Sequence, residues 1–234
     1  MSMIAGWLHR CSTFAWLAGG ILACVAGFAS GAVNVNAAND YYTSLGTGAL
    51  KVVEQYHLGP CENRLRDRDY QRALGECQFI LKIFPNHPKA LELTIQICEL
   101  WKSPRCAVDG VFESAIAINP KAAGTFVLQG IYQYGAKQYP LAIKSLGYAL
   151  ELQPNSVNAN YNLALTYLET KQFELANVHA QKAYALGATY PGLRNRLTQL
   201  GYWKPAEAGS TPPVDAKAAA PGTGTAPGTP SGGK

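Results

Sequence analysis

The chain has 234 residues, of which 48% are hydrophobic and only 15% are charged, and this length corresponds to one or two ordinary domains. The apolar content excludes a wholly disordered chain, and the presence of only one long uncharged run excludes a polytopic membrane protein. The formal net charge is +5, but residues 38–203 hold 16 Lys and Arg against 13 Asp and Glu, a net of +3 that does not indicate a nucleic-acid partner.

The first 37 residues are predicted to be a signal peptide or a membrane anchor. Residues 11–33 carry no charge and are mostly small or apolar. Val35 and Ala37 supply small residues at the spacing that a signal peptidase recognises. The first expectation is therefore cleavage after Ala37, with cleavage after Ala32 or Ala38 as alternatives.

The uncharged run permits two other outcomes. Its 23 residues are long enough to span a bilayer as an uncleaved anchor. Residues 21–24 also resemble a weak lipobox, in which Cys24 would be acylated to give a lipoprotein. All three outcomes place the rest of the chain across a membrane, and a bacterial periplasm is the simplest location.

The part of the chain that follows the leader contains an internal repeat. Four segments share a short apolar pattern at steps of 35, 34 and 34 residues, and the first three end in proline; they are residues 80–85, 115–120, 149–154 and 183–188. A second recurrence lies upstream of three of them, where an aromatic residue precedes an alanine by three positions, as in Tyr70, Tyr139 and Phe173.

Over about residues 54–188 this pattern resembles the tetratricopeptide repeat, a helix–turn–helix unit of 34 residues. The resemblance implies an all-α solenoid of antiparallel helix pairs, with about four repeats of which the first is degenerate. Gly130, Ala142 and Ala149 are expected where the two helices of a unit cross, since small side chains permit close approach. The solenoid and its capping helix are predicted to occupy residues 38–203.

Departures from the pattern shape the two ends. Gly59-Pro60 falls inside the first helix of the first unit, and a proline in a helix interior removes a hydrogen bond. We therefore expect a helix over residues 45–58, a break and a restart at Pro60.

A C-terminal helix is predicted to cap the last repeat, on the helical spacing of Leu193, Leu197, Leu200 and Trp203. Residues 204–234 are rich in Pro, Gly, Ala and Thr and are predicted to be a disordered tail.

Four cysteines lie beyond the leader, namely Cys61, Cys77, Cys98 and Cys106. They allow three pairings. None has the CxxC spacing of a zinc site, so no metal site is predicted. Because export leads to an oxidising compartment, disulfides are the default. A Cys98–Cys106 bond would staple one helical hairpin and a Cys61–Cys77 bond another. Cys77–Cys98 is the competing pair, and buried free thiols are the alternative.

Catalytic chemistry has no support in the sequence. The histidines beyond the leader are His57, His87 in a proline-flanked turn, and His179 alone on a helix surface, and a structural role is expected for each. No phosphate-binding loop, nucleophile elbow or metalloprotease motif is present. We therefore expect no enzyme activity, no cofactor and no metal.

The family resemblance also implies a partner-binding groove, because first helices of stacked repeats line the concave face in this family. Counting the positions that face this side gives a polar end around Lys89, Glu92 and Gln96. The other end is aliphatic and aromatic, and its candidate contacts are Val127, Ile131, Tyr134, Asn158, Tyr161, Leu165 and Leu168. Tyr134 and Tyr161 are the expected anchors, since tyrosine is enriched at binding hot spots. The competing interpretation is that these residues pack on neighbouring helices or beneath the capping helix.

The resemblance therefore implies a non-catalytic scaffold or assembly factor outside the cytoplasmic membrane, which holds a segment of a partner protein. Two alternatives stay open. The chain is either a self-associating structural subunit, whose open N-terminal end stacks on another copy, or an accessory subunit of an envelope enzyme.

Overall fold

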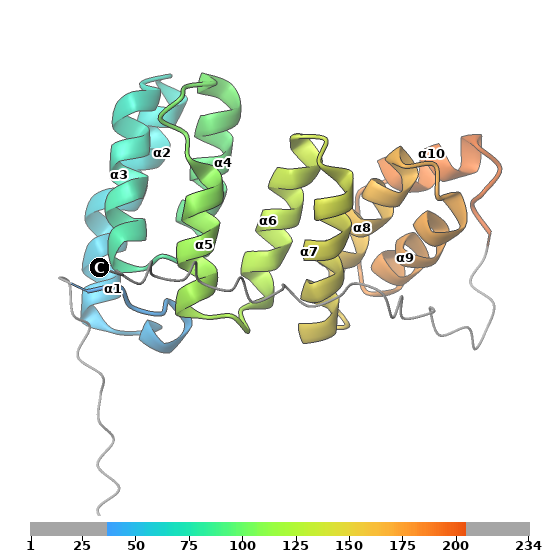
Figure 1. The fold of residues 1–234 in the computed structure, drawn as a ribbon, viewed down its shortest axis with the longest axis horizontal. Coiled ribbons are helices and arrows are strands. Elements are labelled where there is room, and N and C mark those ends of the chain that lie inside the picture. Colours follow the sequence, from blue (N-terminus) through green and yellow to red (C-terminus); the bar gives the residue numbers. More distant parts are fainter. Residues whose placement is uncertain (1–36, 205–234) are drawn as a thin grey trace, which may run out of the picture. The chain divides into compact units, whose positions relative to one another are not determined.

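The computed structural model describes residues 37–204, and this range contains helices and no strand (Figure 1). The predicted leader, with Cys24 and the possible anchor at residues 11–33, and the predicted tail from residue 205 onward lie outside the described residues. The ten α-helices confirm the predicted all-α fold. They are α1 (Gly48–Val53), α2 (Gly59–Arg66), α3 (Tyr70–Ile83), α4 (Pro88–Trp101), α5 (Val108–Ile118), α6 (Ala123–Gly135), α7 (Tyr139–Leu152), α8 (Val157–Glu169), α9 (Phe173–Ala185) and α10 (Gly192–Gln199).

Successive helices pack as antiparallel neighbours, which is clearest for α6 with α7 and for α8 with α9 (Figure 1). The turn within each pair has a basic residue in the left-handed region, at φ 54 to 60°: Arg68, Lys102, Lys137 and Lys171. In three of these turns the next amide donates back to the carbonyl five residues earlier, as Gln138 does to Gln133 at 2.8 Å. This Schellman bond ends the first helix, and a cation suits the negative end of the helix dipole.

The helices of the third repeat approach closely at a glycine, as the repeat pattern predicts. A Cβ placed on Gly130 would lie 2.5 Å from the Cγ of Leu146, which is fully buried on α7. Ala142 and Ala149 on the same helix are also fully buried. The core of this half therefore depends on interlocked small and large side chains.

A C-terminal helix covers the last repeat, as the spacing of leucines predicts. Leu193 and Leu197 of α10 are fully buried, but Leu200 is 47% exposed and does not belong to the covering face. The helix ends before it because Gly201 adopts a φ of 75°. The amide of Tyr202 then donates to the carbonyl of Leu197 at 2.8 Å, and this glycine-based stop turns the chain away.

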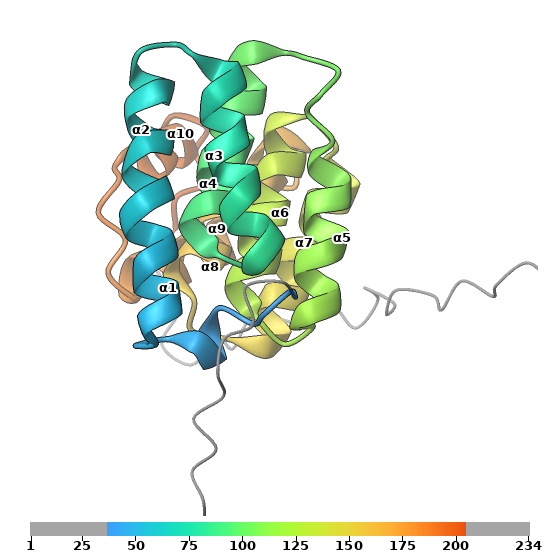
Figure 2. The same ribbon diagram turned by 90° about the vertical axis from the view of Figure 1, so that its left-hand side faces the viewer.

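The predicted break at Gly59-Pro60 is wrong. A π-helical turn, η2 (Glu54–Leu58), joins α1 to α2, and the backbone stays right-handed helical through Leu58 and Gly59. The two helices thus form one column beside α3 (Figure 2). The physical reason is that in a π turn each amide donates to the carbonyl five residues earlier instead of four, which shifts the hydrogen-bond pattern by one residue. Pro60, whose ring nitrogen has no hydrogen, then occupies the second position of α2, where a missing donor is tolerated.

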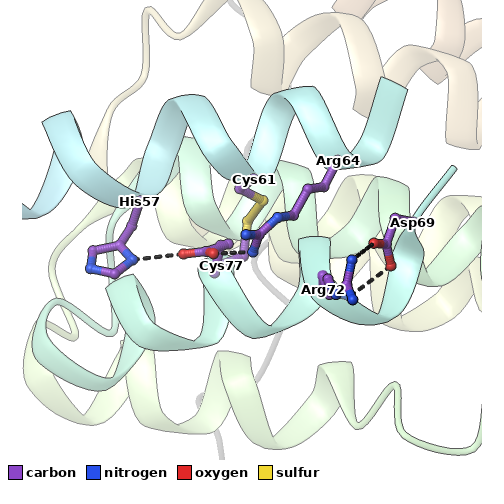
Figure 3. A network of polar contacts seen from close by, with 7 residues as sticks. His57, Cys61, Arg64, Asp69, Arg72 and Cys77 are labelled. Atoms are coloured by element: carbon purple, nitrogen blue, oxygen red, sulfur yellow. Dashed lines mark hydrogen bonds and ion pairs between the residues drawn. A yellow bond between two sulfur atoms is a disulfide. The ribbon is translucent and has the colours of Figure 1, made fainter. Parts of the chain in front are cut away.

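Two disulfides and an ion cluster hold the first repeats together. Cys61–Cys77 joins α2 to α3, and Cys98–Cys106 joins the end of α4 to the segment before α5, so both favoured pairings are present. Figure 3 shows the first bond beside His57 and Arg64, which both contact the carboxylate of Glu76 on α3. The irregular first repeat is therefore cross-linked by covalent and ionic contacts.

Candidate functional site

A groove with a volume of about 580 Å³ lies on the face formed by α4, α6 and α8. These are the first helices of the second, third and fourth repeats. The loop that joins α7 to α8 forms one edge of the groove. Its lining consists of Pro88, Lys89 and Glu92 of α4; Gly124, Val127, Leu128 and Ile131 of α6; and Gln153, Asn155, Ser156, Val157 and Asn158.

The floor of this groove is apolar and one wall is rich in amides. Val127 is 7% exposed and Ile131 is half-buried against the same core cluster. Gln153, Asn155 and Asn158 on the opposite wall are exposed. An amide side chain offers both a donor and an acceptor. This wall can therefore pair with the free N–H and C=O groups of an extended peptide, while the floor takes its apolar side chains.

The α4 wall is charged, and its charges compensate one another. The Nζ atom of Lys89 lies 3.3 Å from a carboxylate oxygen of Glu92 and 3.9 Å from one of Glu62 on α2. All three side chains are substantially exposed, so each ion pair contributes little to stability. The wall can exchange these contacts for those of a charged partner at small cost.

The structure divides the predicted groove residues into two groups. Val127, Ile131 and Asn158 line the groove together with Lys89 and Glu92. The remaining four do not line it; they are Tyr134, Tyr161, Leu165 and Leu168. Leu168 belongs to the core cluster that includes residues of α10, and Tyr161 and Leu165 pack against that cluster.

Tyr134 belongs to a polar chain that runs to the capping helix. Its hydroxyl donates to Glu169 of α8 over 3.4 Å, and the same carboxylate oxygen accepts from Arg196 of α10 at 2.8 Å. Burial, and then the charge of Glu169, raise the pKa of Tyr134. The hydroxyl therefore stays protonated and acts as a donor that links α6 to α8.

Tyr161 lies within an aromatic cluster at the C-terminal end. Its ring centroid is 5.7 Å from that of Tyr190 and 6.4 Å from that of Tyr184. Burial raises the pKa of Tyr161. Arg194 of α10 stacks over Tyr184 at 4.4 Å and over Trp203 at 5.0 Å, so the cluster fastens α10 to α9.

A segment that the sequence reasoning missed borders the groove. We call residues 39–44 the N-terminal strap. Asp40 accepts hydrogen bonds from Asn86 at 2.6 Å and from Asn119 at 3.1 Å, which tie it to two successive inter-repeat loops. Tyr42 of the strap reaches the groove, because a Cβ on Gly124 would lie 2.9 Å from its hydroxyl. No local pattern indicates this, since the partners are far apart in the sequence.

The three histidines beyond the leader make structural contacts. His87 is 1% exposed; its Nδ1 accepts from the amide of Ala90 and its Nε2 lies 3.0 Å from Glu54. Burial lowers the pKa of His87 although Glu54 acts in the opposite direction. His179 is half-buried rather than on the open helix surface, because its ring stacks on Tyr167 at 5.6 Å.

Within residues 37–204, no group of three or more His, Cys, Asp or Glu side chains is arranged to hold a metal ion. Among the same residues, no helix combines the length and the apolar character that crossing a membrane requires.

The comparisons with known proteins agree with this architecture. The family model described as tetratricopeptide repeat matches residues 147–176, and no curated protein sequence matches the chain. The solved structure of PilF from Pseudomonas aeruginosa superposes with a TM-score of 0.54 at 20% identity, covering 66% of this chain and 70% of PilF. MamA from Desulfovibrio magneticus RS-1 gives 0.45 at 22% identity, covering 58% of this chain and 75% of MamA. The PilF likeness supports the fold alone, and the MamA likeness is too distant to add to it.

Proposed function

Because the chain is a tetratricopeptide repeat protein with a helical-solenoid fold, we propose that it is a non-catalytic scaffold that binds an extended segment of a partner protein. The binding site is the groove on α4, α6 and α8. Val127 and Ile131 form its floor and Asn158 its amide wall. Tyr134, Tyr161, Leu165 and Leu168 support this site from the side of the capping helix.

The observation that carries this proposal is the pairing of an apolar floor with an exposed amide wall in one groove of about 580 Å³. An extended peptide places alternate side chains on one side and leaves its backbone groups free at the edges. An apolar trough with convergent amides meets both requirements at once.

The two disulfides support a location outside the cytoplasmic membrane. Disulfides persist in oxidising compartments such as the periplasm and are rare in the cytosol. Cys61 and Cys77 are fully buried and bonded to each other, which suits a permanent structural link. We accordingly place the scaffold in the envelope of a bacterium, most simply in the periplasm.

A site-specific photo-crosslinker tests the groove. Placed at position 158 in the full chain and activated in intact cells, it is expected to capture a partner that mass spectrometry can identify. The matched control is position 144 on α7, where Lys144 is also exposed but does not line the groove. Equal capture from both positions would contradict the groove.

The identified segment then allows an affinity measurement by calorimetry. Ile131→Ala removes part of the floor and is expected to weaken binding about tenfold. Asn158→Ala, at an exposed position, should weaken it several-fold without changing the melting temperature. Unchanged affinity in both variants would contradict the proposal.

A further inference from the structure

The outer face of the first helix pair carries apolar side chains that the rest of the described chain leaves uncovered. Val52 is 53%, Tyr56 63% and Phe79 43% exposed. They surround a hollow of about 460 Å³, which Lys82 and Ile83 also line. We call Val52, Tyr56, Phe79 and Lys82 the end patch.

The opposite end of the solenoid shows what a covered end looks like. There α10 lies over the last repeat and buries Leu193 and Leu197 completely. The first repeat has no such helix among residues 37–204. A cluster of exposed aromatic and aliphatic side chains at the uncovered end is the kind of surface that contacts another molecule or a membrane.

The end patch is held in a fixed arrangement. The ring of His57 stacks on Phe79 with centroids 4.0 Å apart. The same imidazole contacts Glu76 at 2.7 Å, and Arg64 contacts that carboxylate from α2 (Figure 3). The ring of Phe79 is thus held by a cross-linked helix pair, and little of its conformational entropy is lost when it meets a partner.

The charge around the end patch is positive. Lys82 of the end patch is exposed and forms no ion pair within residues 37–204. The nearby carboxylates are engaged elsewhere, since Glu76 contacts Arg64 and His57 while Glu54 contacts His87. A two-fold contact with a second copy would bring the same patch against itself and oppose the Lys82 side chains of the two copies. An anionic partner fits instead.

The position of the chain's apolar run favours a lipid surface as that partner. The amide of Asn39 donates to the carbonyl of Ile83 at 2.7 Å, and Ile83 lines the hollow of the end patch. The uncharged residues 11–33 end six residues before Asn39, and six extended residues reach roughly 20 Å. The run's 23 uncharged residues are enough to span a hydrocarbon core of about 30 Å.

We propose that residues 11–33 stay in the membrane as an anchor and that the end patch rests on the surface of an anionic bilayer. The rings of Tyr56 and Phe79 enter the interfacial region, where amphipathic aromatic side chains are favoured. Lys82 lies at the lipid phosphates. The anchor gives the patch a high effective concentration near the bilayer, so a small contact area is sufficient. The groove on α4, α6 and α8 stays free for a partner protein.

Lysine footprinting of the full chain tests this contact. The purified chain is reconstituted into phosphatidylcholine vesicles with or without one-third phosphatidylglycerol and treated with an amine-acetylating reagent. Labelling of Lys82 is expected to fall about fivefold in the anionic vesicles, since a lysine near such a surface gains about that factor. Lys144 and Lys171, which are exposed in the C-terminal half, are internal controls and should not change. High salt should restore the labelling.

Variants separate the patch from other surfaces. The double substitution Tyr56→Ser and Phe79→Ser should abolish the protection, whereas Tyr190→Ser, which changes a 67% exposed tyrosine near α10, should leave it intact. All three positions are exposed, and an unchanged circular dichroism spectrum verifies the fold.

Four results would overturn the proposal. The first is equal labelling in both kinds of vesicle. The second is protection that rises with protein concentration in the absence of vesicles, which would identify a second copy. The third is protection that appears only after an envelope protein fraction is added, which would identify a protein partner. The fourth is an intact mass that begins at residue 38, which would exclude the anchor.

Discussion

The N-terminal repeats, α1 to α5, and the C-terminal repeats, α6 to α10, reach stable packing by different means. In the C-terminal half the helices interlock through small residues, as at Gly130 against Leu146. In the N-terminal half the repeat pattern is irregular, and both disulfides lie there, between residues 61 and 106. The π turn, the Glu76 ion cluster and the N-terminal strap lie in this half as well.

The difference shows how a repeat protein compensates for a degenerate unit. Consensus repeats obtain their stability from nearest-neighbour packing. A unit that departs from the consensus buries less apolar surface against its neighbours. Cross-links stabilise it instead, because they reduce the entropy of its unfolded state. Four sets of substitutions test this contrast, from the largest expected effect to the smallest.

The largest effect is expected from removing the bond between α2 and α3. Cys61→Ala with Cys77→Ala opens a loop with a sequence separation of 16, and loop entropy predicts a loss of about 3 kcal/mol in the free energy of unfolding. Cys98→Ala with Cys106→Ala opens a separation of 8 and should cost about 2.5 kcal/mol. Urea unfolding measures both, and hydrogen exchange should show the loss in α2 and α3 but not in α8 and α9. Uniform loss across all helices would break the comparison.

The next effect tests close packing in the C-terminal half. Gly130→Ala places a methyl group 2.5 Å from Leu146, and such overpacking costs about 2 kcal/mol. Gly147→Ala is the matched control, since it lies inside α7 and its Cβ would meet no atom within 4 Å. That change should stabilise the protein by about 0.5–1 kcal/mol through helix propensity. Thermal unfolding that ranks the two variants in the reverse order would contradict this account.

A smaller effect is expected from the aromatic cluster beneath α10. Tyr161→Ala removes the contacts with Tyr184 and Tyr190 and should lower stability by about 1–2 kcal/mol. Tyr134→Ala loses the link through Glu169 and should cost less. The paired measurement is melting temperature and partner affinity. Lost affinity with an unchanged melting temperature would instead make these tyrosines direct binding anchors.

The smallest effect concerns pH and belongs to the N-terminal half. Burial lowers the pKa of His87 in the folded state, whereas an unfolded histidine titrates near pH 6.5. As the pH falls below about 6.5, the unfolded state binds the proton first, so the free energy of unfolding decreases. His87→Asn keeps a side chain that can cap α4 but does not titrate. Its stability should therefore depend less steeply on pH between 7 and 5, and equal slopes would contradict the prediction.

The sequence predicted what depends on local and periodic signals. The 34-residue period located the helix pairs and the glycine crossing at Gly130, and helical spacing beyond the repeats located the capping leucines Leu193 and Leu197. The disulfide pairs followed from their places in helical hairpins. Three of the seven predicted groove residues also line the groove: Val127 and Ile131, the fifth and ninth residues of α6, and Asn158, the second residue of α8.

What the sequence missed depends on contacts between distant segments or on a local balance of hydrogen bonds. Pro60 indicated a break, but the helix continues through a π turn five residues long, after which Pro60 lies at the start of α2, where its missing amide hydrogen is tolerated. Leu200 has the right spacing to face inward, yet Gly201 ends the helix first. By position Tyr134 and Tyr161 suit either the groove or the underside of the capping helix, and only the packing of α10 shows their contacts with the cap.

The N-terminal strap changes the order in which this chain can complete its fold. Asp40 binds amides that lie 46 and 79 residues further along the chain. A growing or translocating polypeptide therefore presents the strap before the repeats and can complete its contacts through Asp40 only once the second repeat is present. Ordinary solenoids can lose a terminal unit without disturbing the others. Here the strap closes a loop around the first two repeats, so those units should fold and unfold as one cooperative block.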